Sequence, residues 1–195
     1  MHFDVIIIGA GSAGMRVAAA LQAAGRKTAV IGAGRSINEV EVGPYERGGG
    51  TLLLGDKVRE GLFAGDRLTA VRTENLGTYA LEADAFVLAT GKFLGGGLVA
   101  DMERVYEPLF GLDVVYESDR AKWFDADFGA PQPFLQFGVR TDASLRPALG
   151  GRTVENLYVC GELLAGVTAV EGRAAIGASA DRVIQLLNPE AHAES

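Results

Sequence analysis

The sequence has one cysteine and two histidines, and each scarcity excludes a class of site. Because Cys160 is the only thiol, the chain has no intramolecular disulfide, no paired redox cysteines and no thiolate zinc site. His2 and His192 both lie near the termini, so neither a histidine metal site nor a Ser-His-Asp triad is expected. We therefore predict no metal site, and no residue stands out as a catalytic base.

Long apolar runs and excess positive charge are also missing. No apolar run is long enough to span a bilayer, so no membrane span is expected. The first residues lack the basic region and cleavage site of a signal peptide, which favours a cytoplasmic protein. The 18 Lys and Arg residues face 25 Asp and Glu residues, a net charge of −7. A nucleic-acid partner is not expected, because such surfaces need clustered basic residues.

Glycine is abundant, with 27 residues, and its first cluster lies in a recognisable context. Residues 3–8 form an apolar, β-branched run that predicts a strand buried on both faces. A glycine turn follows, then an alanine-rich helix over residues 15–24 and a second strand over residues 28–31. This order predicts a βαβ unit.

The glycine turn has the GxGxxG spacing of a dinucleotide-binding site. Gly9 permits a tight turn, Gly11 lets a pyrophosphate approach the backbone, and Gly14 lets the helix pack on the sheet. The start of the helix would offer N–H groups and positive dipole to phosphate, and Ser12 and Ala13 of the turn are expected to contact the pyrophosphate as well. The alternative is a turn without a ligand, although three glycines at this spacing serve packing poorly.

The second strand ends without the acidic residue that usually binds the adenosine ribose in such sites. The positions concerned are Gly32, Ala33, Gly34 and Arg35. Three interpretations stay open. The backbone of a glycine loop holds the ribose, Arg35 and Ser36 accept the 2′-phosphate of NADP, or Arg35 is a solvated loop charge.

Further strands are expected in the middle of the chain. Residues 32–50 are rich in turns and show no convincing helix, and residues 51–54 suit a third parallel strand. An antiparallel meander is predicted over residues 57–63, 67–73 and 78–82, and a separate buried strand over residues 85–89.

The last part of the chain is harder to interpret. Between residues 92 and 155 we expect aromatic packing around Pro131 and Pro133, supplied by Trp123, Phe124, Phe128, Phe134 and Phe137. A buried strand at residues 156–160 and a helix at 173–187 follow. Cys160 is interpreted as a small buried hydrophobe rather than a redox thiol.

The order of these elements resembles flavoproteins of the glutathione reductase type, which have two dinucleotide-binding domains. The strand ending in Ala89-Thr90-Gly91 and the late strand ending in Cys160-Gly161-Glu162 carry the resemblance. It implies that the glycine turn holds the pyrophosphate of FAD and that Val58 contacts adenine through its backbone. Glu162, where aspartate is usual, would hold the ribityl chain.

A closer resemblance, to the B subunits of anaerobic glycerol-3-phosphate dehydrogenases, runs through residues 84–98, 107–112, 137–147 and 156–166. Those proteins carry a large insert where this chain has only residues 32–50. A more distant resemblance, through residues 90–95, is to the GidA-type tRNA-modifying flavoproteins.

Together these features predict one α/β FAD-binding domain over residues 1–195. Its fold would be a Rossmann-like parallel sheet with an antiparallel β-meander crossover and a small C-terminal annex. The expected segments are a βαβ unit (1–34), a shortened loop (35–50), a strand and meander (51–91), a reduced insert (92–155) and a final strand and helix (156–187).

The predicted function is that of an FAD-binding oxidoreductase or electron-transfer subunit of unknown substrate. Because the shortened segment leaves the flavin without a cover, we expect a homodimer or a partner subunit. The alternatives are an NADP-binding reductase, a noncatalytic flavin-binding module of a complex, and a tRNA-modifying flavoprotein. Lys92 is expected either to reach phosphate or flavin, or to be a surface lysine. The expected cofactor-binding residues are Gly9, Gly11, Ser12, Ala13, Gly14, Gly32, Arg35, Val58, Thr90, Gly91, Lys92, Gly161, Glu162, Arg173, Ala174 and Ile176.

Overall fold

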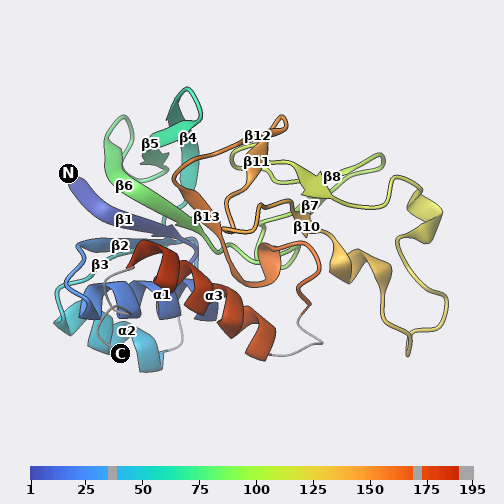
Figure 1. Ribbon diagram of the computed structural model, residues 1–195, viewed down its shortest axis with the longest axis horizontal. Coiled ribbons are helices and arrows are strands. Elements are labelled where there is room, and N and C mark those ends of the chain that lie inside the picture. The colour runs from blue at the N-terminus through green and yellow to red at the C-terminus, as the bar shows by residue number, and fades with distance from the viewer. Residues whose placement is uncertain (35–38, 169–172, 189–195) are drawn as a thin grey trace.

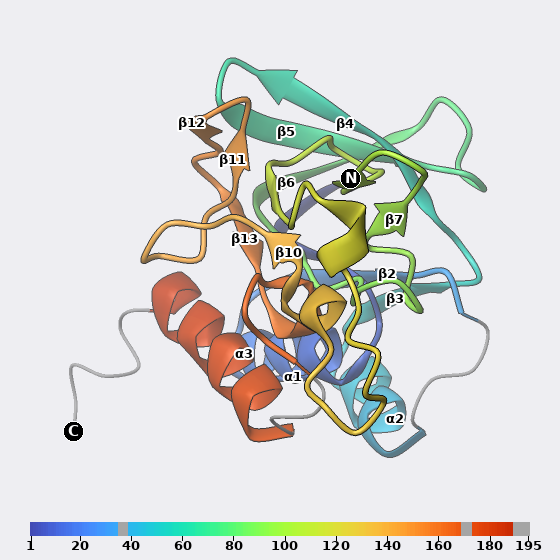
Figure 2. The ribbon, with the colours of Figure 1, turned by 90° about the vertical axis from the view of Figure 1, so that its right-hand side faces the viewer.

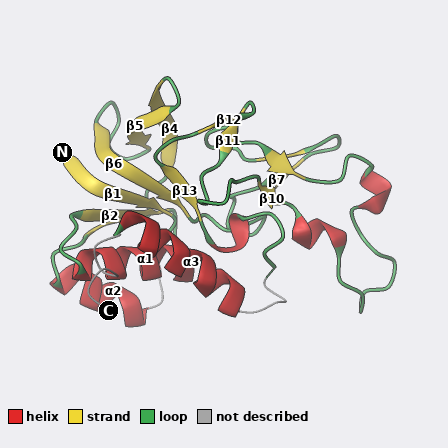
Figure 3. Ribbon diagram, in the orientation of Figure 1, coloured by secondary structure: helices red, strands yellow, loops and turns green. Residues whose placement is uncertain are grey.

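The computed structural model describes residues 1–34, 39–168 and 173–188 (Figure 1). Within these residues, seven strands form one sheet in the order β3-β2-β1-β6-β5-β4, with β13 paired to β6. The strands are β1 (His2–Ile8), β2 (Thr28–Gly32), β3 (Thr51–Leu54), β4 (Val58–Ala64), β5 (Arg67–Thr73), β6 (Ala80–Leu88) and β13 (Leu157–Val159). The helices α1 (Ser12–Ala23), α2 (Glu39–Arg47) and α3 (Arg173–Leu187) lie together on one face of the sheet (Figures 1 and 3). The fold is the predicted α/β class with a largely parallel sheet.

Strand β1 lies in the middle of the sheet and explains how the fold buries its core. It pairs in parallel with β2 on one side and with β6 on the other. Its side chains alternate between two apolar clusters: Val5 and Ile7 pack towards the helices, and Ile6 and Ile8 pack towards the opposite face. The continuous apolar run predicted this burial on both faces.

Strand β6 is longer than expected and joins two kinds of sheet. The sequence predicted two strands, over residues 78–82 and 85–89, but residues 80–88 form one. Its first part pairs antiparallel with β5, and its later part pairs in parallel with β1 and β13. Burial alternates along the first part and becomes continuous near the end. The change in the apolar pattern, which suggested two strands, therefore reflects different neighbouring strands along a single β6.

Helix α2 was not expected, because Gly43 and Pro44 lie within it and both residues disfavour helix interiors. Tertiary contacts hold it in place. The Tyr45 side chain is buried, its hydroxyl lies 2.8 Å from Thr28 Oγ1, and Gln22 of α1 donates to its carbonyl oxygen. Packing against α1 and β2 thus outweighs poor local propensity, and the prediction that residues 32–50 lack a helix is wrong.

The annex, residues 92–155, covers the other face of the sheet with loops and very short strands (Figures 2 and 3). Three antiparallel pairs form within it: β7 (Val99–Ala100) with β8 (Val105–Tyr106), β9 (Val114–Val115) with β10 (Gly138–Val139), and β11 (Ala148–Leu149) with β12 (Arg152–Thr153). Short 3-10 turns occur at Arg120–Lys122, Pro133–Gln136 and, beyond the annex, Gly161–Leu163.

Only part of the expected aromatic packing forms in the annex. Trp123 and Phe137 are buried, and each makes an edge contact with the Tyr116 ring. Phe124 and Phe128 are exposed instead, by 63% and 97%. They lie on the segment that projects away from the sheet on the right of Figure 1.

Across the described ranges, every helix is too short or too polar to cross a membrane.

Candidate functional site

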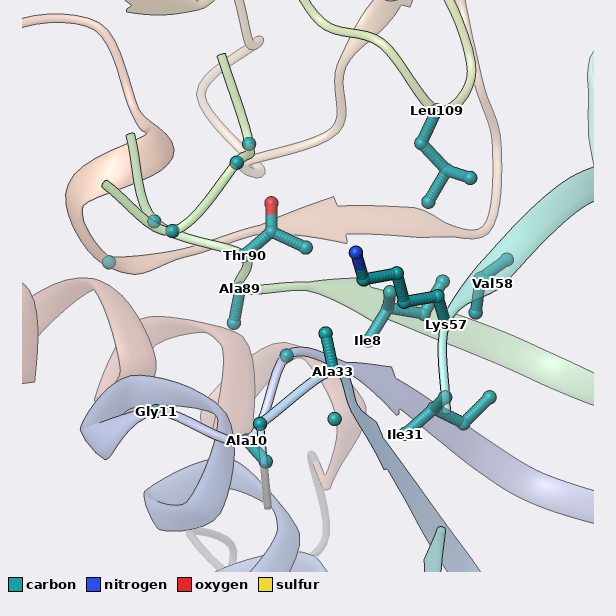
Figure 4. A pocket seen from close by; sticks show the side chains of 18 of the residues that line it. Ile8, Ala10, Gly11, Ile31, Ala33, Lys57, Val58, Ala89, Thr90 and Leu109 are labelled. Atoms are coloured by element: carbon teal, nitrogen blue, oxygen red, sulfur yellow. The ribbon is translucent and has the colours of Figure 1, made fainter. Parts of the chain in front are cut away.

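A cleft of about 680 Å³ opens where β1, β2 and β6 end, beside the start of α1 (Figure 4). Its volume lies in the range of cofactor sites, and the carboxyl ends of parallel strands are where such folds bind ligands. Most of the residues predicted from sequence come together in its lining: Gly9, Gly11, Ser12, Ala13, Gly32, Val58, Thr90, Gly91, Gly161, Glu162 and Ile176.

The glycine turn between β1 and α1 contains two kinds of glycine. A Cβ atom on Gly9 would lie 2.3 Å from the Ala89 carbonyl oxygen, and one on Gly14 would lie 2.0 Å from the Gly9 carbonyl oxygen. Both positions are therefore closed by packing, and the φ of +113° at Gly9 also requires glycine. A Cβ atom on Gly11 would meet nothing within 4 Å, so the space beside it belongs to the cleft.

Helix α1 begins at this turn without a side-chain cap. Gly11 is the N-cap residue, and no side chain bonds to the first N–H groups. Ser12 and Ala13 open the helix and line the cleft. Because the first N–H groups of a helix have no partner within it, they are available to an anion.

One end of the cleft is formed by the turns after β2 and β3. The Gly34 carbonyl oxygen accepts from Gly55 N–H at 3.1 Å, and the Gly32 carbonyl oxygen accepts from Asp56 N–H at 3.2 Å. The side chains of Ile31, Val58 and Leu109 give this end an apolar wall (Figure 4). Arg35, expected here, lies outside the described residues.

Sequence reasoning missed several residues at this end: Asp56, Lys57, Arg59, Pro108 and Leu109 all line the cleft. Asp56 is 3% exposed, and its carboxylate accepts from the N–H groups of Lys57 and Asn75. Nothing in the sequence placed the turn after the third strand beside the cleft.

Glu107 was also missed, although it lies in a segment that carried the resemblance. It lines the cleft but is 2% exposed, and its carboxylate accepts from the N–H groups of Leu109, Phe110 and Leu112. Burial raises the pKa of Glu107 above its usual value, and the backbone hydrogen bonds oppose that rise. Glu107 thus shapes the loop that carries Leu109 and is not free to bind a ligand.

The opposite end of the cleft is built around Gly161 and the start of α3. Ser179 joins them, because its hydroxyl accepts from Gly161 N–H at 2.9 Å and donates to the Ile176 carbonyl at 2.8 Å. Glu162 is half-buried and lines the cleft. Ala174 is exposed and does not line it, and the Arg173 side chain lies outside the described part.

Cys160 and Lys92 lie near the cleft but do not line it. Burial raises the pKa of the Cys160 thiol to about 12, so it stays protonated at neutral pH, in line with the hydrophobe interpretation. Lys92 is 7% exposed, and its ammonium donates to the carbonyls of Leu135 and Val167, the latter at 2.6 Å. The surface-lysine alternative is wrong, and the side chain is directed at those carbonyls rather than at the cleft.

No group of three or more His, Cys, Asp or Glu side chains able to hold a metal ion occurs in the described ranges. The cleft itself is lined by backbone N–H groups, an apolar wall and a few charged side chains.

The sequence is similar to curated proteins of known name. The B subunit of anaerobic glycerol-3-phosphate dehydrogenase from Vibrio cholerae is 47% identical over 128 residues, which cover 65% of this chain and 29% of the relative. The protein of the same name from Yersinia enterocolitica is 40% identical over 135 residues, or 69% of this chain and 32% of the relative. The chain thus spans less than a third of the length of these relatives.

Solved structures share the fold. A thioredoxin reductase from Gloeobacter violaceus superposes with a TM-score of 0.61 at 12% identity, covering 96% of this chain and 94% of that one. The thioredoxin reductase of T. acidophilum gives 0.57 at 11% identity, covering 97% and 99%. The sequence profile of the FAD binding domain matches residues 4–39 and 45–177, which contain all of the residues that line the cleft. The chain therefore belongs to the FAD binding domain family.

Proposed function

We propose that this chain holds FAD in the cleft and acts as the flavin-bearing part of an oxidoreductase. The observation that carries the proposal is the contrast within the glycine turn. Gly9 and Gly14 are closed by packing, whereas Gly11 faces open space beside the uncapped start of α1. A pyrophosphate fits this cradle, because a Cβ atom at Gly11 would occupy the space that the phosphates need.

The lining suggests how the rest of the cofactor lies. The apolar wall of Ile31, Val58 and Leu109 suits the adenine ring, and Ser12 and Ala13 N–H groups suit the phosphates. At the other end, Glu162 would bind the ribityl hydroxyls, and Ile176 would lie beside the flavin ring. Bound FAD would supply hydride and electron transfer, while the residues named here bind and orient it.

A second protein chain completes the site in this proposal. The relatives are named as B subunits of a dehydrogenase, and this chain spans less than a third of their length. A homodimer or a partner subunit would cover the flavin and supply the substrate contacts. The name of the relatives makes glycerol 3-phosphate the first substrate to assay, both with the chain alone and with proteins that purify with it.

The visible spectrum of the purified protein, followed by identification of the molecule that heat releases, tests the cofactor. We expect a yellow protein that releases FAD. Release of FMN would contradict the placing of adenine at the Val58 wall. A colourless protein that FAD neither stabilises nor colours would overturn the proposal. Titration with NADP tests the alternative of an NADP-binding reductase, for which Arg35 was the candidate residue.

A single methyl group tests the cradle. Gly11→Ala should leave the unfolding midpoint of the FAD-free protein unchanged, because the new Cβ meets no protein atom within 4 Å. It should weaken FAD binding by about tenfold or more, equivalent to about 1.4 kcal/mol, by crowding the phosphates. Calorimetric titration with FAD measures this effect. Gly129→Ala, on an exposed annex loop, is the matched control and should bind FAD normally. Unchanged FAD affinity in Gly11→Ala would place the pyrophosphate elsewhere.

A further inference from the structure

The cleft is lined by one lysine, Lys57, to which the proposed FAD site gives no role so far. Lys57 lies between β3 and β4, and its ammonium points into the cleft (Figure 4). The base of the side chain is fixed, since Lys57 N–H donates to Asp56 Oδ1 and the Lys57 carbonyl accepts from Glu74 N–H, each at 2.8 Å. These two hydrogen bonds fix the direction in which the Lys57 side chain leaves the backbone. Its methylene groups remain free to rotate towards a ligand.

The charged groups around Lys57 are engaged with the protein itself. The Asp56 carboxylate accepts two backbone N–H groups, and the Glu107 carboxylate accepts three. Arg59 pairs with Glu74. The Lys57 ammonium, by contrast, has no hydrogen bond or ion pair with any described residue. Lys57 is exposed to solvent where it lines the cleft, and a cation without a protein partner at such a wall is available to an anionic ligand.

The described residues at the end of β2 beside it, Gly32, Ala33 and Gly34, carry no acidic side chain for a ribose. Gly32 closes the strand against Ala10, and Ala33 and Gly34 follow. Asp56 does not take over this role, because its carboxylate is buried and held by the backbone. The charged side chain available to a ligand at this end of the cleft is therefore the positive Lys57 ammonium, whereas a ribose site would offer a negative carboxylate.

We infer that Lys57 binds a phosphate of the dinucleotide on its adenosine side, an inference that rests on the proposed FAD site. Two elements of the protein then bind the diphosphate together. The start of α1 offers N–H groups from one side, and the Lys57 ammonium offers a full charge from the other. The cleft selects a ligand by its diphosphate more than by its ribose hydroxyls, so ADP alone should occupy the same subsite.

Lys57→Gln tests the inference in the full chain. Its dissociation constants for FAD and for ADP should rise by roughly 10- to 100-fold, the range for one lost hydrogen bond to a charged group. Raising the salt concentration should weaken ADP binding to the wild type more than to the variant, because one screened charge pair is missing from the variant. Lys57→Arg should recover most of the affinity. Lys122→Gln makes the same charge change on the annex, away from the cleft, and should behave as the wild type.

The outcomes separate this inference from the proposed function. A wild-type protein that binds neither FAD nor ADP contradicts the FAD site itself. A wild type that binds FAD, with Lys57→Gln equal to it in affinity and in salt dependence, overturns the role of Lys57 alone. Circular dichroism of each variant excludes misfolding, and an affinity loss in Lys57→Gln that Lys57→Arg does not recover would also count against a phosphate contact.

Discussion

The sheet and the annex are held together in different ways. In the sheet, backbone pairs with backbone along ladders, and apolar side chains fill both faces. In the annex the paired strands are only two residues long, and carboxylate side chains accept many of the backbone N–H groups that have no strand partner. The acidic residues there whose side chains accept backbone N–H groups are Asp101, Glu107, Asp113, Glu117, Asp119, Asp125, Asp127 and Asp142.

This difference changes the meaning of the acidic composition. At the level of sequence, the excess of Asp and Glu argued only against a nucleic-acid partner. In the structure, many of these carboxylates fold the chain locally, because Asp and Glu side chains satisfy the N–H groups of turns that have no strand partner. Composition alone therefore indicates the net charge of the protein. The position of each acidic residue within a turn shows which backbone N–H groups its carboxylate binds.

The largest expected effect contrasts one glycine from each region. Gly14→Ala should destabilise the protein by about 3 kcal/mol or more, because the new Cβ would lie 2.0 Å from the Gly9 carbonyl oxygen. Gly150→Ala in the annex has open space around it and only the strain of a φ of +58°. It should lose about 1 kcal/mol. Urea denaturation of both variants measures the difference, and equal losses would remove the proposed distinction between a packed turn and an open one.

A smaller effect is expected where a carboxylate organises the annex. Glu107→Gln replaces one acceptor oxygen with an NH₂ group that faces backbone donors. It should lower the free energy of unfolding by about 1–3 kcal/mol, the cost of buried donors left without a partner. Glu103→Gln is the control, because that side chain is exposed. A stable Glu107→Gln would mean that the loop around Leu109 does not depend on this carboxylate.

The smallest effects should appear as opposite pH dependences within the annex. Hydrogen bonds from the backbone N–H groups of Glu103 and Arg104 hold the pKa of Asp101 below its usual value. Burial works against ionisation of Asp142, but hydrogen bonds from Arg146 and Ser144 outweigh it and lower its pKa as well. Both groups therefore contribute stability above the ordinary aspartate pKa of about 3.9, and lose it as the pH falls through their lower folded values.

Glu107 has the opposite sign, because burial raises its pKa. Its contribution is most favourable below the ordinary glutamate pKa of about 4.3, and it declines as the pH rises through the raised folded value. An NMR titration should show the amides of Glu103 and Arg104 changing at lower pH than those of Leu109 and Phe110. The same midpoint for both pairs would show that the two kinds of carboxylate do not differ.

The sequence predicted the sheet far better than the annex. Continuous apolar runs and the glycine turn led to β1, α1, β2 and β13, because burial on two faces leaves a clear pattern, while a short run between turns led to β3 and helical spacing led to α3. Helix α2 was missed because the contacts of Tyr45 with Thr28 and Gln22 cannot be inferred from local propensity. The exposed Phe124 and Phe128 were expected to pack, because the sequence does not show which aromatic residues find partners.

The site followed the same division. The glycine turn and the residues after β6 and β13 were found, because they end buried strands at one edge of a sheet. Lys57, Asp56 and Leu109 were missed, because their place in the cleft depends on how the turn after β3 and the annex loop fold back. Lys92 was misjudged because a charged side chain after a glycine turn gives no sign of the two carbonyls that receive it.

The unbroken strand β6 also has a consequence for how the chain folds. Leu88 pairs with Ile8 on one side and with Val159 on the other, so the later part of this strand has both of its partners far away in the sequence, whereas its first part pairs with the nearby β5. During synthesis the first βαβ unit must wait for β6, and the edge of β6 that receives β13 stays open until residues 157–159 have been made. Because such long loops must close before their contacts stabilise anything, assembly of the central sheet should be slow, and β13 is made latest of its seven described strands.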